Sequence, residues 1–372
     1  MTSSFYRNTL LTLSICCLVT FSGPYCSAQQ GTKTFAERLG WKAGDRVLLI
    51  HVDDAGMSHD SDVGVERALA AGLATSLSVM MPCPWTPEIV HYLHQHPGLD
   101  AGLHLTLTSE WSEYRWGPVA GAQAVPGLVD QEGAMWPSVE EVVQHATADE
   151  VEKEIRAQLA RARTMGFNPT HLDSHMGTVF ANPAFLERYI KVGAENHIPI
   201  MFPGGHDTLL SEQYRDETIA ALKNEGKWTP GQAVPEEPAL AQARLMAEKV
   251  WDLGLPVLDD LYNVSYDWTL APGVPETDDN LRAMKVSRYA AAFHSLKPGV
   301  TMMIVHCTDT SSTFPFISSS GPTRRGDLLA MLSPELRKAA QREGLYLTTW
   351  RELQERRDRV ARSDGATGKT RQ

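Results

Sequence analysis

The stretch that decides the fold is Val47-Leu48-Leu49-Ile50-His51-Val52-Asp53-Asp54-Ala55-Gly56. It begins as a short run of branched apolar residues, which is typical of a strand buried on both faces. It ends in two adjacent carboxylates and a glycine, and because neighbouring strand residues point to opposite faces, the chain must turn here or the acids must meet different partners. Burying two like charges is costly unless a cation joins them, and a divalent metal is the common solution. The alternative is that one acid caps a helix that starts near Ser58.

Apolar strand candidates alternate with helical stretches along the rest of the chain. The expected strands are Val47–Asp53, Thr75–Met81, Asp100–Thr106, Thr170–Asp173, Ile198–Phe202, Val300–His306 and Leu345–Thr349. The expected helices include Val63–Ala71, Ala148–Met165, Pro183–Asn196, Ala239–Leu253, Asp279–Leu296 and Pro334–Glu343. This alternation predicts a mostly parallel sheet of about seven strands with helices outside, and that number favours a (β/α) barrel over an open sheet. In such a barrel the active site lies at the carboxyl ends of the strands, where Asp53 and Asp54 stand.

The first 28 residues have the pattern of a cleaved secretory signal peptide. Arg7 is their only charged residue, an apolar stretch follows, and the small residues up to Ala28 form the expected cleavage site. A lipoprotein signal at Cys26 and an uncleaved anchor are the weaker alternatives. Cleavage would leave 344 of 372 residues and an exported, periplasmic or secreted, protein.

Composition narrows the domain organisation and the partners. No linker or repeat divides the chain, so we expect one domain over residues 29–362 and a disordered tail over residues 363–372. Loss of Arg7 takes the net charge from −11 to −12, and an acidic chain without a basic cluster is a poor partner for nucleic acid or an anionic membrane surface. The mature chain keeps Cys83 and Cys307, whose pairing the sequence leaves open. The oligomeric state is not indicated.

Three further strand ends carry polar residues that a structural strand does not require. His104 lies in the third predicted strand, His171, Asp173 and His175 surround the end of the fourth, and His306 ends a strongly apolar strand. A single strand histidine is more often a hydrogen-bonded core residue than a ligand, but several at one sheet edge with two acids suggest a metal site. Imidazole and carboxylate suit zinc and also magnesium or manganese.

The chain resembles the YdjC-like, or ChbG-type, carbohydrate deacetylase family. The resemblance rests on Asp53-Asp54-x-Gly, on Gly102-Leu103-His104-Leu105-Thr106-Leu107-Thr108 and on Thr170-His171-Leu172-Asp173-Ser174-His175, in that order. It implies a deformed (β/α) barrel related to polysaccharide deacetylases and one divalent metal ion, zinc or magnesium.

The resemblance also implies roles for single residues. Asp54, His104 and His175 would hold the metal, Asp53 would be the general base, and His306 would protonate the leaving amine. His171 and Asp173 are interpreted as groups that orient the ligands or fill the core.

The chain departs from the family's usual pattern at three places, which concern the substrate pocket more than the ligands. His51-Val52 replaces Asn-Ala, His175-Met176-Gly177 replaces a run of histidines, and His306-Cys307-Thr308 replaces His-Pro.

Two candidates for substrate contact stand outside the family motifs. Arg324, beside Arg325, could bind a substrate oxygen, or both could form a solvated surface pair. Trp111, near Tyr114 and Trp116, could stack on a sugar ring, although a packed loop is the simpler interpretation.

The functional hypothesis is a metal-dependent hydrolase that removes N-acetyl groups from acetylated amino sugars or small oligosaccharides. A hydrolase of another amide or ester bond would use the same water-activating groups. A non-catalytic carbohydrate-binding protein on the same barrel is the alternative from another class, but binding alone requires neither Asp53 as base nor His306 as acid.

Overall fold

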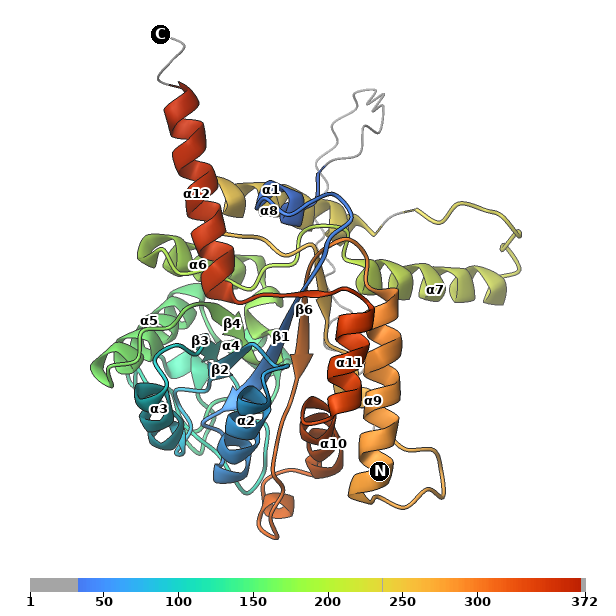
Figure 1. The fold of residues 1–372 in the computed structure, drawn as a ribbon. Coiled ribbons are helices and arrows are strands. Elements are labelled where there is room, and N and C mark those ends of the chain that lie inside the picture. Colours follow the sequence, from blue (N-terminus) through green and yellow to red (C-terminus); the bar gives the residue numbers. More distant parts are fainter. Residues whose placement is uncertain (1–32, 236, 369–372) are drawn as a thin grey trace.

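The computed structural model describes residues 33–235 and 237–368, so the predicted signal peptide lies outside the described residues. One sheet of parallel strands forms the centre, with helices around it (Figure 1). Its strands are β1 (Arg46–Ala55), β2 (Ser76–Val79), β3 (Ala101–Leu105), β4 (Leu172–Ser174), β5 (Asp260–Tyr262), β6 (Gly299–Val305) and β7 (Tyr346–Leu347). The strand order β4-β3-β2-β1-β6-β5, with β7 paired to β1, places the stretch from Val47 to Gly56 at the centre of the sheet.

β1 is covered on both faces, which explains its continuous apolar sequence. Nine of its ten residues are buried, and it pairs with β6 along its whole first part, from Arg46 to Val52. Its other edge is shared, because β7 pairs with Val47 and Leu48 whereas β2 pairs further along, from His51 to Ala55.

A short extended segment, residues 198–203, closes the sheet into a deformed barrel. Its Ile200 bridges to Leu172, the first residue of β4, and its Pro203 bridges to Leu258 just before β5. The strand predicted at Ile198–Phe202 therefore lies where the barrel requires one, but it makes only single bridges. Pro199 and Pro203 lack backbone N–H groups, so a continuous ladder cannot form. The predicted (β/α) barrel is confirmed.

Twelve α-helices are described in residues 33–235 and 237–368, and Figure 1 shows α2, α3 and α5 beside β2 and β3, with α9, α10 and α11 beside β6. They are α1 (Phe35–Arg38), α2 (His59–Ala71), α3 (Thr86–Gln95), α4 (Val139–His145), α5 (Ala148–Thr164), α6 (Pro183–Asn196), α7 (Thr208–Asn224), α8 (Pro238–Asp252), α9 (Asp278–Ser295), α10 (Gly321–Met331), α11 (Pro334–Arg342) and α12 (Trp350–Gly368). A 3-10 segment, η2 (His175–Phe180), follows β4. None of the described helices is long and apolar enough to cross a membrane.

Two sequence expectations differ from the structure at the level of single elements. α12 continues to Gly368, into the segment expected to be a tail, because residues 363–368 contain no proline that would stop the helix. Strand β5 has no counterpart among the expected strands, since a three-residue strand with an acid at its start gives no periodic signal. Cys83 and Cys307 are both buried and free, so the open question of their pairing is answered.

Candidate active site

The two adjacent acids face one site because β1 stops being regular at Asp54. Asp54 adopts a φ of 65°, and the register between β1 and β2 shifts between Val52 and Ala55. This breaks the alternation of side chains, so Asp53 and Asp54 both reach the cavity at the strand ends. The helix-cap alternative does not hold, because the side chain of Ser58 caps α2 by accepting a hydrogen bond from the N–H of Ser61.

Asp54, His104 and His175 bring three ligand atoms to one point. Asp54 Oδ1 lies 3.2 Å from His104 Nε2 and 3.3 Å from His175 Nδ1, and the two nitrogens are 3.2 Å apart. Ligands bonded to one zinc-sized ion in tetrahedral geometry are separated by about 3.3 Å. Asp54 Oδ1 is buried and has no hydrogen-bond partner in the described part of the chain, as expected of an atom meant for a cation. These three residues therefore fit a divalent metal ion.

Arg324 leaves one oxygen of Asp54 free for this point. Its Nη1 lies 2.7 Å from Asp54 Oδ2, and its Nε donates to Ser320 Oγ. The guanidinium is only 2% exposed, which excludes the solvated surface pair considered from the sequence. Burial by itself would raise the pKa of Asp54, but Arg324, His104 and His175 outweigh it and hold that pKa well below its usual range. Asp54 is therefore an anion ready to bind a cation.

Asp54, His104 and His175 form a triad in which each imidazole contacts a further carboxylate through the ring nitrogen that does not face the convergence point. His104 Nδ1 lies 2.8 Å from Asp173 Oδ1, and His175 Nε2 lies 3.0 Å from Glu110 Oε1. Carboxylates in this position fix the ring orientation and the tautomer of metal-binding histidines. Burial opposes the charged imidazole, yet Glu110 and Asp54 raise the pKa of His175 to about 9, and Asp53 and Asp173 raise that of His104 well above its usual value.

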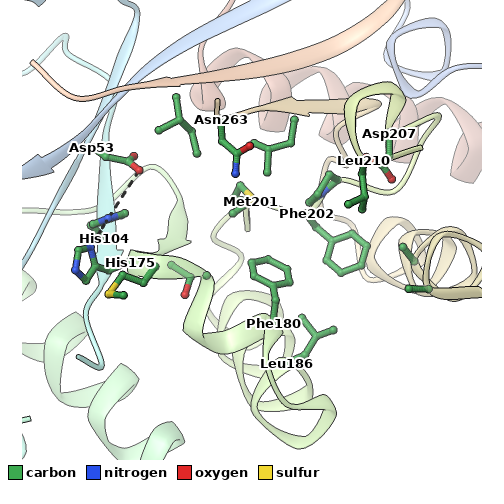
Figure 2. A pocket seen from close by; sticks show the side chains of 18 of the residues that line it. Asp53, His104, His175, Phe180, Leu186, Met201, Phe202, Asp207, Leu210 and Asn263 are labelled. Atoms are coloured by element: carbon green, nitrogen blue, oxygen red, sulfur yellow. Dashed lines mark hydrogen bonds and ion pairs between the residues drawn. The ribbon is translucent and has the colours of Figure 1, made fainter. Parts of the chain in front are cut away.

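Asp53 lies beside the triad without being one of the three converging groups. Its Oδ2 is 3.8 Å from His104 Nε2, the contact dashed in Figure 2, and 3.9 Å from His306 Nε2. Its Oδ1 lies 3.2 Å from Nε2 of the fully buried His51, which also lies 2.8 Å from Asp173 Oδ2. Burial alone would lower the pKa of His51, but the nearby carboxylates of Asp173 and Asp53 raise it to about 9. His51 is thus a buried cation that connects the proposed base to the carboxylate behind His104.

His306 ends β6 on the opposite side of Asp53. Its backbone N–H donates to Asp327, whose other oxygen pairs with the buried Lys285, so the strand end is firmly held. The ring packs edge-on against Tyr266. Burial, with a contribution from Arg324, lowers the pKa of His306 to about 4 despite the nearby acids. The imidazole is therefore neutral at neutral pH.

A cavity of about 600 Å³ opens from these groups. The predicted catalytic and metal-binding residues all line it, namely Asp53, Asp54, His104, His175 and His306. Arg324 lines it as well. Away from them its wall is mostly apolar, with Phe180, Leu186 and Phe202 labelled in Figure 2. Asn263 and Asp207 add polar groups, and burial, followed by the charge of Asp260, raises the pKa of Asp207 to about 7.

The structure does not bring Trp111 to this cavity. Trp111 is 9% exposed and packs against Trp116 in a small apolar cluster, because the aromatic residues of this loop bury one another. His171 is also a core group, as it stacks on Trp350 and fills the space above Gly102, where a Cβ atom would come within 2.4 Å of its ring. Sequence reasoning missed Glu110, since one acid in an irregular loop carries no pattern, and gave His51 no role.

The barrel with this cluster at its carboxyl edge defines a class of protein, the (β/α)-barrel hydrolases. The comparisons with known proteins narrow the class to a family. The family model described as YdjC-like protein matches residues 47–342. A carbohydrate deacetylase of Thermus thermophilus is 31% identical over 324 residues, which are 86% of this chain and 97% of that protein. The chain therefore belongs to the YdjC-like family, which confirms the resemblance seen in its motifs.

Two further comparisons are consistent with this membership. A chitooligosaccharide deacetylase of Serratia marcescens is 32% identical, but the match covers only 35% of this chain and 49% of that protein. The solved structure of a proposed cellobiose-phosphate cleavage protein of Enterococcus faecalis has a TM-score of 0.61 and 18% identity, and covers 83% of this chain and 99% of that one. At this identity the second likeness shows the fold alone.

Proposed function

We propose that this protein is a metal-dependent deacetylase that hydrolyses the N-acetyl group of acetylated amino sugars. The observation that carries the proposal is the convergence of Asp54 Oδ1, His104 Nε2 and His175 Nδ1 within 3.3 Å of one another, beside the separate carboxylate of Asp53. The names of the relatives supply the bond and the substrate class, because they are carbohydrate and chitooligosaccharide deacetylases.

The metal would be held by Asp54, His104 and His175. When bound, a divalent ion acidifies water and polarises a carbonyl group, which are the two requirements of amide hydrolysis. Arg324 keeps Asp54 ionised, and Asp173 and Glu110 keep the two imidazoles in the ligand orientation. These contacts form the site before the substrate arrives.

Asp53 is the proposed general base, and His306 the proposed donor to the leaving amine. The two carboxylate oxygens of Asp53 have different neighbours: Oδ1 contacts His51, and Oδ2 lies toward His306 and the site. The low pKa of His306 means that its imidazole is neutral at neutral pH and carries one ring proton, so it can act as an acid toward the amine only after it gains a second proton during the reaction. Asp53, 3.9 Å away, is the group placed to supply it.

The test is the release of acetate from purified protein incubated with di-N-acetylchitobiose. We expect turnover that is lost after treatment with a chelator and restored by a divalent metal, with zinc, magnesium and manganese added in parallel. An acetyl ester of a neutral sugar is the comparison substrate, and cleavage of the ester without release of acetate from the amide would favour the other-bond hydrolase. Binding of the sugar without release of acetate in the metal-loaded protein would support the non-catalytic alternative.

We also propose that the protein acts outside the cytoplasm, from the signal-like pattern of residues 1–28. Terminal sequencing of the protein isolated from its native host should find a mature chain that starts at or near Gln29. Recovery of residues that precede Cys26 would contradict cleavage at this place.

A further inference from the structure

The cavity changes character within a short distance of the reaction centre. Beyond the acids and histidines most of its lining is apolar, and we define the apolar chamber by five of these side chains: Phe180, Leu186, Phe202, Leu210 and Met246. They come from η2, α6, the barrel-closing segment, α7 and α8, so five separate parts of the chain converge on one space (Figure 2).

The chamber has an apolar interior and a polar mouth. Leu186, Leu210 and Met246 are only partly buried although they lie inside the cavity, whereas Gln242 and Lys249, which also line it, are exposed. Phe180 and Phe202 offer aromatic faces on which a sugar ring can stack, on the side of the chamber toward the strand ends. The wall contributed by α6, α7 and α8 offers mainly aliphatic side chains, which suit an apolar group.

We propose that the chamber binds an aliphatic substituent on the sugar, so that the preferred substrate is an amphiphilic N-acetylamino-sugar glycoside and not a bare oligosaccharide. This inference rests on the proposed deacetylase function and specifies its substrate class. The acetyl group that leaves has a single methyl group. The cavity, of which the chamber is a part, has a volume of about 600 Å³ and is therefore much larger than this methyl group. The chamber must therefore hold a part of the substrate that remains after hydrolysis.

A set of four substrates tests the assignment. They are methyl and octyl N-acetyl-β-glucosaminide, methyl N-octanoyl-β-glucosaminide and di-N-acetylchitobiose, each used below any micelle-forming concentration. Because each buried methylene is worth roughly threefold in binding, kcat/KM for the octyl glycoside should exceed that for the methyl glycoside by roughly 100-fold or more. Equal values for the two glycosides would overturn the proposal, while acetate release from either would leave the deacetylase function intact. A preference for the N-octanoyl compound would also overturn it, since the chamber would then hold the acyl group.

Binding gives a readout that does not depend on turnover. Calorimetry with octyl and methyl β-glucoside, neither of which has an amide, should detect binding of the octyl compound at a concentration where the methyl compound gives no signal. Indistinguishable heats would contradict the chamber assignment even if the protein proved inactive on every amide. Octyl binding without any acetate release would instead support the chamber and count against the deacetylase function.

Three variants locate the effect. Ala243 lines the cavity from α8, and Ala243→Phe should fill the chamber and reduce the octyl-to-methyl ratio of kcat/KM at least tenfold. Leu245→Gln changes an exposed side chain two residues further along the same helix and should leave that ratio unchanged. Thermal melting and metal content of both proteins establish that they are folded. If Leu210→Gln and Ala243→Phe both keep the wild-type ratio, the octyl chain binds elsewhere and the proposal fails.

Discussion

The strand ends and the apolar chamber are two halves of one cavity, built by different means. The acids and histidines stand on β1 and β3 or directly after β4 and β6, and each is held by contacts to other buried groups. The chamber is formed largely by α6, α7 and α8, whose side chains there are partly exposed. The hydrogen-bonded sheet fixes the positions of the proposed catalytic and metal-binding side chains, while α6, α7 and α8 determine which substrate groups fit into the cavity. Substitutions should therefore affect metal and turnover in the first half and substrate choice in the second.

The largest effect is expected at Asp54. Asp54→Ala removes one of the three proposed metal ligands and leaves Arg324 as a buried cation beside the two histidines, so metal content and acetate release should both fall to background. Elemental analysis of the purified protein and an acetate assay measure the two losses. Leu210→Gln, in the chamber, should keep its metal. A metal-loaded and active Asp54→Ala protein would show that the two halves are not divided as described.

Asp53→Asn should separate catalysis from metal binding. The amide keeps the shape of the carboxyl group but cannot accept a proton, so the metal should remain and kcat should fall roughly 10²–10⁴-fold. Metal content and kcat are measured on the same preparation. If Asp53→Asn loses the metal while Asp54→Asn keeps it, the roles within the pair are reversed.

Glu110→Gln should weaken the metal site without abolishing it. Loss of the carboxylate behind a histidine ligand costs roughly 10–100-fold in metal affinity, which competition with a chromophoric chelator measures. Glu113→Gln, at an exposed position in the same loop, is the matched control and should bind metal like the unaltered protein. Equal affinities for the two variants would mean that the contact between Glu110 and His175 does not support the metal.

The smallest effect is expected at His51, in the pH dependence of stability. Its pKa is about 9 in the folded protein against 6.5 for the free side chain, so the folded state holds the proton more tightly. The stabilisation from this proton is complete below about pH 6.5 and is lost as the pH rises through 9, with an upper limit of roughly 3 kcal/mol. Denaturation at pH 6 and pH 9 should show that His51→Gln loses more stability at the lower pH. His91→Gln, on the surface of α3, controls for the general response, and a larger loss at pH 9 would contradict the interpretation.

The sequence predicts the strand-end half far better than the chamber, for a physical reason. Buried parallel strands leave an apolar signature, and the polar residues that interrupt it stand at strand ends, so the pattern alone assigns Asp53, His104 and His306 to one edge of the sheet. The family resemblance then supplies the ligand set, whose convergence the geometry shows while the catalytic roles remain predictions.

Residues whose partners come from distant parts of the chain are beyond the reach of the sequence. Arg324 could be an exposed cation or a buried one, and only the fold places it on Asp54. Glu110 has no pattern around it, and α7, none of whose described side chains is buried, has almost no apolar stripe. Trp111 has aromatic neighbours in the sequence, as a residue that stacks on a sugar ring often does, but it packs against other aromatic residues of its own loop.

The two prolines of the barrel-closing segment make it the part of the barrel that is weakly hydrogen-bonded to its neighbours. Three backbone hydrogen bonds, donated by Leu172, Met201 and Leu258, join residues 198–203 to the neighbouring segments, and Gly204 donates a fourth to Leu258 directly after the segment. Elsewhere the sheet has continuous ladders, such as the seven paired residues between β1 and β6. In native-state hydrogen exchange these four amides should open first among those of the barrel, independently of global unfolding. Met201, Phe202 and Pro203 also line the cavity. We therefore expect local opening of the barrel to occur in the wall beside the apolar chamber.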